Sequence, residues 1–515
     1  MSSIEKWKQE LPEFRQKTAD FYSGELDKGS YKGYSGRFGS YAQQGGKSSM
    51  LRLRTTAGRV TPDKLAFVVK AIKEDDVRRV HFTTCESIQF HDLNKDQVCS
   101  LIEEAWDAGM VTMGGGGDYP RNVMCSPLSG VDKEGYFDVL PYAEAAADYL
   151  MGFVDAEKMP RKLKVCFSDS PENIPHATYR DLGFTARPDG RFDVYSAGGL
   201  GNNPKFGLKV AEAIEPEDIL LYIKAMWLTF RAYGNYENRG KARTRYMQEV
   251  CGGEEGYRKA FLEKLKEAEA AGDVPKLCVK PEPVTKTGDG SVCGDRRAIA
   301  QKQEGLYAVE WHPIGGNPAL ESLKALYETI KDMDAVELRL APYETAYIIN
   351  LTGAEAQQVI AVLPDSAESM FETSVSCIGA STCQVGVRDS QALLAACIEA
   401  VRTAEIADGA LPKIYISGCP SSCAGHQTAA IGFNGAAKKT EAGVQAAFML
   451  HAGGCSRQGE EKMGRQYGTV LTEDIPEMLV KIGKAAEAAG QSFEEWYKAD
   501  EAAFEAIVTP YIERK

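Results

Sequence analysis

Hydrophobic and polar residues alternate along the chain with periods typical of strands and helices, beginning near Met50. The segment MLRLR at 50–54 predicts a strand, and 77–84 predicts a second one. Residues 61–75 predict a helix between them, because Thr at 61 and Pro at 62 are favoured at an N-cap and a first helical position. A further helix is predicted over 96–108.

A later segment shows the same order of elements. Strand, helix, strand, strand and helix are predicted at 306–313, 317–333, 335–342, 345–351 and 353–363. The two segments lie about 255 residues apart, which suggests an internal duplication. Coincidence is the alternative, since units of this kind are common in α+β proteins.

Each of these segments is followed by a longer α/β stretch with short apolar strands between turn residues. The first stretch has predicted strands at 162–168 and 192–199 and a helix over about 216–233. The second has predicted strands at 414–418, 429–435 and 447–454.

The pattern divides the chain into six parts. Residues 1–45 are polar and rich in Gly and Tyr, and predict an extended arm that wraps other domains. Residues 284–301 lack periodicity and predict a linker. The predicted parts are an arm at 1–45, a first half-domain at 46–113, a first α/β domain at 114–283, the linker at 284–301, a second half-domain at 302–365 and a second α/β domain at 366–515.

Composition narrows the class of protein. A chain of 515 residues exceeds one hydrophobic core, and 43% hydrophobic with 26% charged residues is typical of globular proteins. No apolar run approaches the roughly 18 residues of a membrane span, and the N-terminus lacks the apolar stretch of a signal peptide. We therefore expect a cytoplasmic protein without membrane contacts. The 13 cysteines predict reduced thiols, and a net charge of −13 argues against nucleic-acid binding.

Four cysteines in the last third of the chain carry the clearest chemistry. Cys377 and Cys383 form a C-x5-C pattern, and Cys419 and Cys423 form a C-x3-C pattern. Four thiolates from two short segments are what a [4Fe–4S] cluster requires. Structural zinc sites more often have two to four residues between paired ligands, so the x5 gap and the Cys419-Pro420 step favour iron–sulfur. Zinc or unrelated buried thiols are the alternatives.

Basic residues gather in four short clusters against this acidic background. They are Arg52 and Arg54; Arg121; Arg161, Lys162 and Lys164; and Arg239, Lys241, Arg243 and Arg245. Alternate residues of a strand share a face, so Lys162 and Lys164 are expected to point the same way. Such pairs can bind a small oxyanion or the carboxylates of a cofactor. The alternative for any one cluster is a solvated surface.

The cysteine pattern together with MLRLR, PRNVMCSPLSG, PRKLK and GN-x3-R-x2-AR-x-RY resembles the sirohaem-dependent sulfite and nitrite reductase family. The resemblance implies an α+β fold, a pseudo-twofold assembly of two ferredoxin-like half-domains and two α/β domains that bind sirohaem and the cluster. It also implies that Cys377, Cys383, Cys419 and Cys423 ligate a [4Fe–4S] cluster, with Cys423 bridging to sirohaem.

The resemblance assigns roles to the basic residues as well. Arg52, Arg121, Lys162 and Lys164 match the cations that bind the substrate. Arg161, Gln89, Arg243 and Arg245 match positions that contact sirohaem carboxylates.

The implied reaction is the six-electron reduction of sulfite to sulfide, with electrons from ferredoxin or a similar small carrier and a monomer as the expected state. Lys162-Leu163-Lys164 favours sulfite, because nitrite enzymes of the family tend to have Lys-x-Asn here. Reduction of nitrite to ammonia on the same fold is the first alternative. A non-catalytic protein in which the four cysteines hold a cluster or a zinc ion is the second.

Two departures from the family pattern concern the expected cofactor rim. The family has T-x-R-Q-x-x-Q where this chain has TTCESIQ, so Cys85 and Glu86 replace an Arg-Gln pair. Tyr236 replaces a basic residue. The loss of a cation and the gain of an acid are expected to weaken carboxylate binding or to change the geometry of the substrate.

Overall fold

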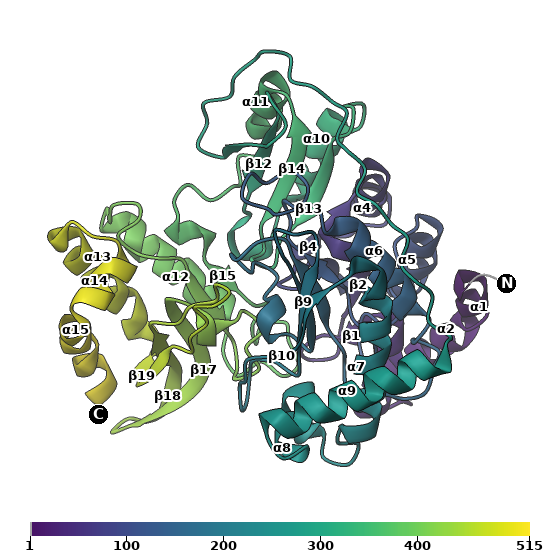
Figure 1. Ribbon diagram of the computed structural model, residues 1–515. Coiled ribbons are helices and arrows are strands. Elements are labelled where there is room, and N and C mark those ends of the chain that lie inside the picture. The colour runs from purple at the N-terminus through teal and green to yellow at the C-terminus, as the bar shows by residue number, and fades with distance from the viewer. Residues whose placement is uncertain (1–2, 515) are drawn as a thin grey trace. The chain divides into compact units, whose positions relative to one another are not determined.

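The computed structural model describes residues 3–514, which form two compact units (Figure 1). The first unit comprises the chain up to Gly199, Pro204–Trp311 and Pro318–Pro364. The second comprises Leu200–Asn203, His312–Asn317 and the chain from Asp365 onward. Within residues 3–514, no helix has the length and apolar character needed to cross a membrane.

The N-terminal segment is helical, and the prediction of an extended arm is wrong. Its elements are α1 (Ser3–Lys8), α2 (Leu11–Ser23), α3 (Lys28–Ser35) and β1 (Ser40–Ala42). Asp27 caps α3 by accepting hydrogen bonds from the backbone N–H groups of Gly29 and Ser30. Trp7 and Phe14 are buried in the core of the first unit. Gly and Tyr obscure the periodicity of α3, and α1 and α2 have few apolar residues, which is why the sequence suggested an extended arm.

The first unit contains two small sheets of matching design. The first has the strand order β1-β2-β5-β4 and the second has β11-β12-β14-β13-β3. The strands of the first are β2 (Ser49–Arg54), β4 (Arg79–Phe82) and β5 (Ser87–Leu93), with helices α4 (Pro62–Glu74) and α5 (Lys95–Asp107). The second has β11 (Ala298–Ala300), β12 (Tyr307–Trp311), β13 (Glu337–Leu340) and β14 (Ala346–Leu351), with α10 (Leu320–Ile330) and α11 (Gly353–Ala361). The repeated order agrees with the predicted duplication.

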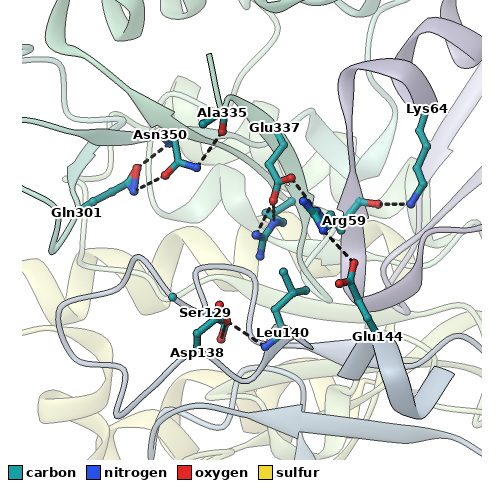
Figure 2. Close-up of polar contacts among 12 residues, drawn as sticks. Arg59, Lys64, Ser129, Asp138, Leu140, Glu144, Gln301, Ala335, Glu337 and Asn350 are labelled. Atoms are coloured by element: carbon teal, nitrogen blue, oxygen red, sulfur yellow. Dashed lines mark hydrogen bonds and ion pairs between the residues drawn. The ribbon is translucent and has the colours of Figure 1, made fainter. Parts of the chain in front are cut away.

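Strand β3 (Arg59–Val60) belongs to the first half of the chain but pairs with β13 in the second sheet. Figure 2 shows how Arg59 anchors it, with Nε donating to Glu337 Oε2 at 2.7 Å and Nη1 to Glu144 Oε1 at 3.3 Å. Burial raises the pKa of Glu337, but the charges of Arg339 and Arg59 outweigh it and lower the pKa below its usual value. The partly exposed Arg59–Glu337 ion pair ties the two half-domains together inside one unit, and the Arg59–Glu144 pair ties β3 to α6 (Leu140–Met151).

Two larger five-stranded sheets also repeat each other. The first unit holds β10-β9-β8-β7-β6, and the second unit holds β15-β16-β17-β18-β19. In each, the first three strands along the chain run parallel and the last two are antiparallel. The strands are β6 (Met124–Cys125), β7 (Val165–Ser168), β8 (Leu182–Ala186), β9 (Phe192–Ser196), β10 (Leu208–Ile214), β15 (Val375–Ser376), β16 (Ile414–Ser417), β17 (Ile431–Thr440), β18 (Gly443–Ala452) and β19 (Arg465–Leu471).

Helices complete each α/β region. In the first unit they are α6 (Leu140–Met151), α7 (Ile219–Tyr233), α8 (Met247–Val250) and α9 (Glu254–Ala271). In the second they are α12 (Ser390–Thr403), α13 (Ile475–Ala489), α14 (Phe493–Ala499) and α15 (Glu501–Glu513). Each sheet has its own buried apolar core, with Phe167 and Phe184 in the first unit and Ile416 and Phe433 in the second.

Candidate functional site

Arg52 and Arg121 meet at the glycine-rich loop that precedes β6. Arg52 Nη1 donates to the carbonyl of Gly115 at 2.5 Å, and Arg121 Nη1 donates to the same carbonyl at 2.7 Å. Arg121 Nη2 donates to the carbonyl of Gly117 at 2.9 Å. Glycine is required at 116, where a Cβ atom would lie 2.5 Å from the carbonyl oxygen of Gly36. The loop therefore places two predicted substrate-binding cations side by side.

Arg54, two residues further along β2, is a supporting residue outside the predicted site. It is buried and donates to the carbonyls of Met113, Pro120 and Arg121 at 3.2, 2.8 and 2.9 Å. Burial and the charge of Arg121 lower its pKa to about 9. Side chains alternate between the two faces of a strand, so the sequence MLRLR already places Arg54 on the same face as Arg52.

Gln89 lies opposite Arg52 in the pairing of β2 with β5. With its amide oxygen turned toward Arg52, that oxygen accepts from Arg52 Nε at 2.9 Å. The amide nitrogen then donates to His91 Nε2 at 3.2 Å. Gln89 thus orients a cation of the site, and its predicted contact with a cofactor stays a prediction.

The basic residues of the first α/β sheet gather at the amino-terminal edge of its parallel strands. Arg121 N donates to the carbonyl of Leu163 at 2.8 Å, which places Arg121 beside the PRKLK segment. Lys164 N donates to Asp181 Oδ2 at 2.8 Å, where β7 and β8 begin in register. Arg180 precedes β8 at this same edge and was missed from the sequence. The sequence feature that could have identified Arg180 is its position just before a parallel strand, which it shares with Lys164.

Cys85 lies in the turn between β4 and β5 and joins this group. Its Sγ is 3.1 Å from Lys164 Nζ. Burial raises the pKa of the Cys85 thiol, but Lys164, Arg180 and Lys162 outweigh burial and lower it to about 6. Burial lowers the pKa of Lys164, and the charge of Cys85 opposes that effect.

Glu86 does not add negative charge at this edge, contrary to the sequence expectation. It is fully buried, and its Oε2 accepts from Cys125 N at 3.0 Å while Oε1 has no hydrogen-bond partner. Burial raises its pKa well above the usual value, which favours the neutral acid. Its left-handed backbone, with φ of 52°, turns the side chain inward.

The predicted cofactor contacts Arg161, Arg243 and Arg245 surround the same loops. Arg161 Nη1 pairs with Asp118 Oδ1 at 2.5 Å, and Arg243 Nη2 pairs with Asp181 Oδ1 at 3.0 Å. Arg245 is buried with its guanidinium 5.1 Å from the ring centre of Tyr246. Asp118 and Asp181 thus hold two of these three guanidiniums, and the contact of all three with a cofactor stays a prediction.

In the second unit, the four predicted cluster ligands lie on two loops after neighbouring parallel strands. Cys377 follows β15 directly, and Cys419 and Cys423 follow β16. The loop that carries Cys383 folds against Gly418, because Val387 N and Arg388 N both donate to the Gly418 carbonyl at 2.9 Å. Parallel strands end at one edge of a sheet, so both loops leave from the same edge.

The backbone near Cys377 suits a thiolate. Gly418 N donates to Cys377 Sγ at 3.1 Å, and such N–H groups stabilise sulfur ligands of clusters. Among residues 3–514, no three His, Cys, Asp or Glu side chains are grouped closely enough to hold a single metal ion. Four thiols on two facing loops fit a [4Fe–4S] cluster by the chemistry of the donor set.

The amino-terminal edge of the first unit fits an anionic group. Arg52 and Arg121 donate to neutral backbone carbonyls, and Arg121 Nε is buried without a hydrogen-bond partner. Burial is the largest cause that lowers the pKa of Arg121, to about 10, and the neighbouring charges of Arg52 and Arg161 act in the same direction. A cavity of about 880 Å³ lies between the N-terminal helices and the glycine-rich loop, and its lining includes Arg37, Gly117, Asp118, Asp155 and Arg239.

Comparison with known proteins assigns the family. Residues 116–268 match the model of the nitrite and sulphite reductase 4Fe-4S domain, and residues 41–105 match that of the nitrite/sulfite reductase ferredoxin-like half domain. The chain contains these two domains of the nitrite and sulfite reductase family. The structure confirms the predicted fold. It contains two half-domain sheets of similar strand order and two α/β sheets of similar strand order.

Curated members of the family are similar along most of the chain. Sulfite reductase [ferredoxin] 2 of Mycolicibacterium paratuberculosis is 24% identical over 88% of this chain and 82% of its own length. Ferredoxin–nitrite reductase of Synechococcus elongatus is 24% identical over 84% of this chain and 85% of its own length.

A solved structure of the same fold supports this architecture. The structure of the Mycobacterium tuberculosis NirA protein superimposes with a TM-score of 0.75 at 22% identity, covering 94% of this chain and 93% of the other. The matched 4Fe-4S family domain covers the first α/β sheet, whereas the four cysteines lie on loops that follow strands of the second sheet, which has the same strand order. Sirohaem and a [4Fe–4S] cluster are the cofactors of the family, and the residues described above fit both.

Proposed function

We propose that this protein reduces sulfite to sulfide in a six-electron reaction at a site that contains sirohaem and a [4Fe–4S] cluster. The observation that carries the proposal is the cationic edge of the first unit, where Arg52 and Arg121 share the Gly115 carbonyl and Lys164 lies beside Cys85. The names of the family relatives, which include sulfite reductase [ferredoxin], support the reaction class.

The cofactors supply the electrons and the metal centre at which sulfur is reduced. Arg52 and Arg121 bind the oxyanion, because a guanidinium offers forked donors that match oxyanion geometry. Lys162 and Lys164 add positive charge, and their ammonium protons are available to an oxygen that leaves as water. Each sulfite oxygen removed takes two electrons and two protons, so proton supply is as necessary as electron supply.

Cys377, Cys383, Cys419 and Cys423 are proposed to hold the cluster, with Cys423 as the link to sirohaem. Arg161, Gln89, Arg243 and Arg245 are proposed to bind sirohaem carboxylates. Their support is the resemblance of the surrounding motifs to those of the family.

Sulfite is favoured over nitrite by Lys164, which stands where nitrite enzymes tend to have Asn. Lys164→Asn is expected to lower kcat/KM for sulfite relative to nitrite by about 10-fold to 100-fold, because one charged hydrogen bond is lost. The measurement is steady-state reduction of each oxyanion with dithionite-reduced viologen by the cofactor-loaded protein. The control is Lys266→Asn, an exposed lysine on α9.

The wild-type protein decides between the two oxyanions in the same assay. A kcat/KM for nitrite that exceeds that for sulfite by orders of magnitude would contradict the sulfite proposal and favour nitrite reduction. An absorption spectrum without a chlorin-type haem band would contradict both and favour a non-catalytic cluster or zinc protein.

Ferredoxin is the proposed electron donor, supported by the names of sulfite and nitrite reductases among the relatives. Reduced ferredoxin is expected to sustain turnover in place of viologen, whereas NADPH alone is not. Turnover with NADPH alone would overturn this part of the proposal.

A further inference from the structure

The turn that carries Cys85 is held rigidly. Asn122 Nδ2 donates to the carbonyl of Cys85 at 3.1 Å and to that of Glu86 at 2.9 Å. The backbone N–H of Cys85 donates to Thr83 Oγ1 at 3.3 Å. The side chain of Cys85 also packs against the buried residues Met124 and Cys166. The position of its sulfur is therefore determined by the fold, and the sulfur meets Lys164 Nζ at 3.1 Å.

The charges around this contact are mostly positive. The charges of Lys164, Arg180 and Lys162 lower the pKa of Cys85. The charges of Arg180 and Arg243 lower the pKa of Lys164. The charge of Cys85 in turn acts to raise the pKa of Arg121, which burial lowers. Repulsion among cations and burial both favour loss of the Lys164 proton. A buried ammonium keeps its charge when an anion compensates for it.

The acidic residues nearby do not compensate Lys164 Nζ. Glu86 points inward to Cys125 N and is favoured as the neutral acid. Asp181 accepts from the backbone N–H of Lys164 and from Arg243 and Thr244. Cys166 has its pKa raised to about 12 by burial and is therefore neutral. The thiol of Cys85 is the acidic group in hydrogen-bonding contact with Lys164 Nζ.

We propose that Cys85 and Lys164 form a thiolate–ammonium pair, in which Cys85 is a positioning residue that keeps Lys164 protonated and oriented at the oxyanion site. This role rests on the proposed function, whereas the pair itself does not. Lys164 gives one proton to a departing oxygen and becomes a neutral amine, and it regains that proton from water while the Cys85 thiolate raises its proton affinity. The thiolate is neither oxidised nor bonded to substrate.

The pair explains how a cysteine can replace the arginine that the family pattern has at this position. An arginine at 85 would add another cation beside Lys164 and would need anions from a cofactor to offset it. A thiolate provides the compensating charge from the protein itself. The lowered pKa of Cys85, about 6, agrees with this arrangement.

The first test measures the reactivity of Cys85 without turnover. The full-length, cofactor-loaded protein is treated with iodoacetamide between pH 5 and 10, and modification of Cys85 is followed by peptide mass spectrometry. The rate is expected to reach half its maximum near pH 6, since the thiolate is the reactive form. Lys164→Met is expected to move this midpoint upward by about one pH unit or more, and the exposed control Lys266→Met is expected to leave it unchanged.

A midpoint near that of an ordinary thiol in the wild type, or one unmoved by Lys164→Met, would overturn the pair. Should Lys164→Met fail to fold, Lys164→Gln and Arg180→Met provide the same comparison, with a smaller upward shift expected for Arg180→Met. Neither result depends on sulfite or nitrite reduction.

The second test measures the effect on catalysis. Cys85→Ser is expected to lower kcat by about 10-fold to 100-fold, with little change in KM, and to move the alkaline limb of the kcat–pH profile to lower pH. Cys85→Asp is expected to restore the limb toward its wild-type position, because a carboxylate replaces the anion. Equal profiles for the Ser and Asp variants would overturn the positioning role. Wild-type protein that reduces neither oxyanion, but shows the alkylation midpoint and its shift, would refute the proposed function and leave the pair supported.

Discussion

The turn after β7 in the first unit and the turn after β16 in the second have the same backbone but different chemistry. Residues 168–184 and 417–433 align without a gap, each linking two parallel strands through a short 3₁₀ helix. Asn173 and Ser422 occupy equivalent positions, and both have left-handed backbones with φ of 53° and 54°. Duplication has thus preserved the conformation of a turn in two units.

One hydrogen bond is conserved between these regions while its acceptor changes. Asp169 N donates to Ser126 Oγ at 3.1 Å in the first unit, and Gly418 N donates to Cys377 Sγ at 3.1 Å in the second. The positions of Cys419 and Cys423 are occupied in the first unit by Ser170 and Ile174. Backbone donors are therefore in place in both turns, and the turns differ in the side chains at the positions of Cys419 and Cys423.

The functional groups of the first unit lie at the opposite edge of its sheet. Lys164 and Arg180 precede β7 and β8, whereas Cys419 and Cys423 follow β16. The difference shows that one sheet topology supports a cationic site at its amino edge and a thiol site at its carboxyl edge.

The largest expected effect comes from removing a thiol in the second turn. Cys423→Ser is expected to lose the cluster, with a fall in reductase activity of at least about 100-fold, because changes to mere supporting groups around metals already cost about 10-fold to 100-fold. Iron and acid-labile sulfide content are the measurement. The matched control is Ile174→Ser in the first turn, which is expected to retain wild-type iron content. Equal iron loss in both variants would show that the two turns do not differ in this role.

A second change tests the shared backbone. A Cβ at Gly183 would collide with the carbonyl of Ala177, and one at Gly432 with the carbonyl of His426. Gly183→Ala and Gly432→Ala are each expected to destabilise the protein by about 3 kcal/mol or more, because backbone has to move. Thermal unfolding measures both, and Gly190→Ala, with no atom within 4 Å of the added Cβ but a φ of +85°, sets the scale for backbone strain alone. If Gly183→Ala and Gly432→Ala were no less stable than Gly190→Ala, the close packing of these glycines against the carbonyls of Ala177 and His426 would be refuted.

The smallest expected effect concerns charge at the amino edge of the first unit. The pKa of Glu86 is raised in the folded state, so folding opposes its ionisation and stability is lost as pH rises from the unfolded value of 4.5 toward the folded pKa. Glu86→Gln is expected to remove this loss and to stabilise the protein by about 1 kcal/mol at pH 8, with little gain at pH 4. Denaturant unfolding at both pH values measures the difference. A gain that is equal at pH 4 and pH 8 would contradict the raised pKa.

Much of the fold could be predicted from local patterns. The strand at 50–54 corresponds to β2, and the helix predicted over 61–75 corresponds to α4 at Pro62–Glu74. The spacing of the second half-domain likewise matches β12 through α11. These elements have clear periodicity and end at Pro, Gly or Asp, so neighbouring residues suffice to define them.

Other features depended on contacts between distant residues. The N-terminal helices were missed because their apolar residues are few, although Trp7 and Phe14 are buried by the rest of the unit. β3 is only Arg59–Val60, and its place beside β13 depends on an ion pair with Glu337, far along the chain. No local pattern specifies such a pairing.

The sequence by itself determined the family, the two repeated halves and the chemical types of the site residues, because ligand spacing and strand patterns are local properties. The four cysteines and the PRKLK segment are recognisable in the sequence alone. The tertiary structure decided which of these residues meet and in what charge state. The Sγ of Cys85 lies 3.1 Å from the ammonium of Lys164, although the two residues are 79 positions apart in the sequence. Glu86, next to Cys85, is buried, and burial favours its neutral form. Burial and the field of distant charges set both outcomes, and neither can be read from neighbouring residues.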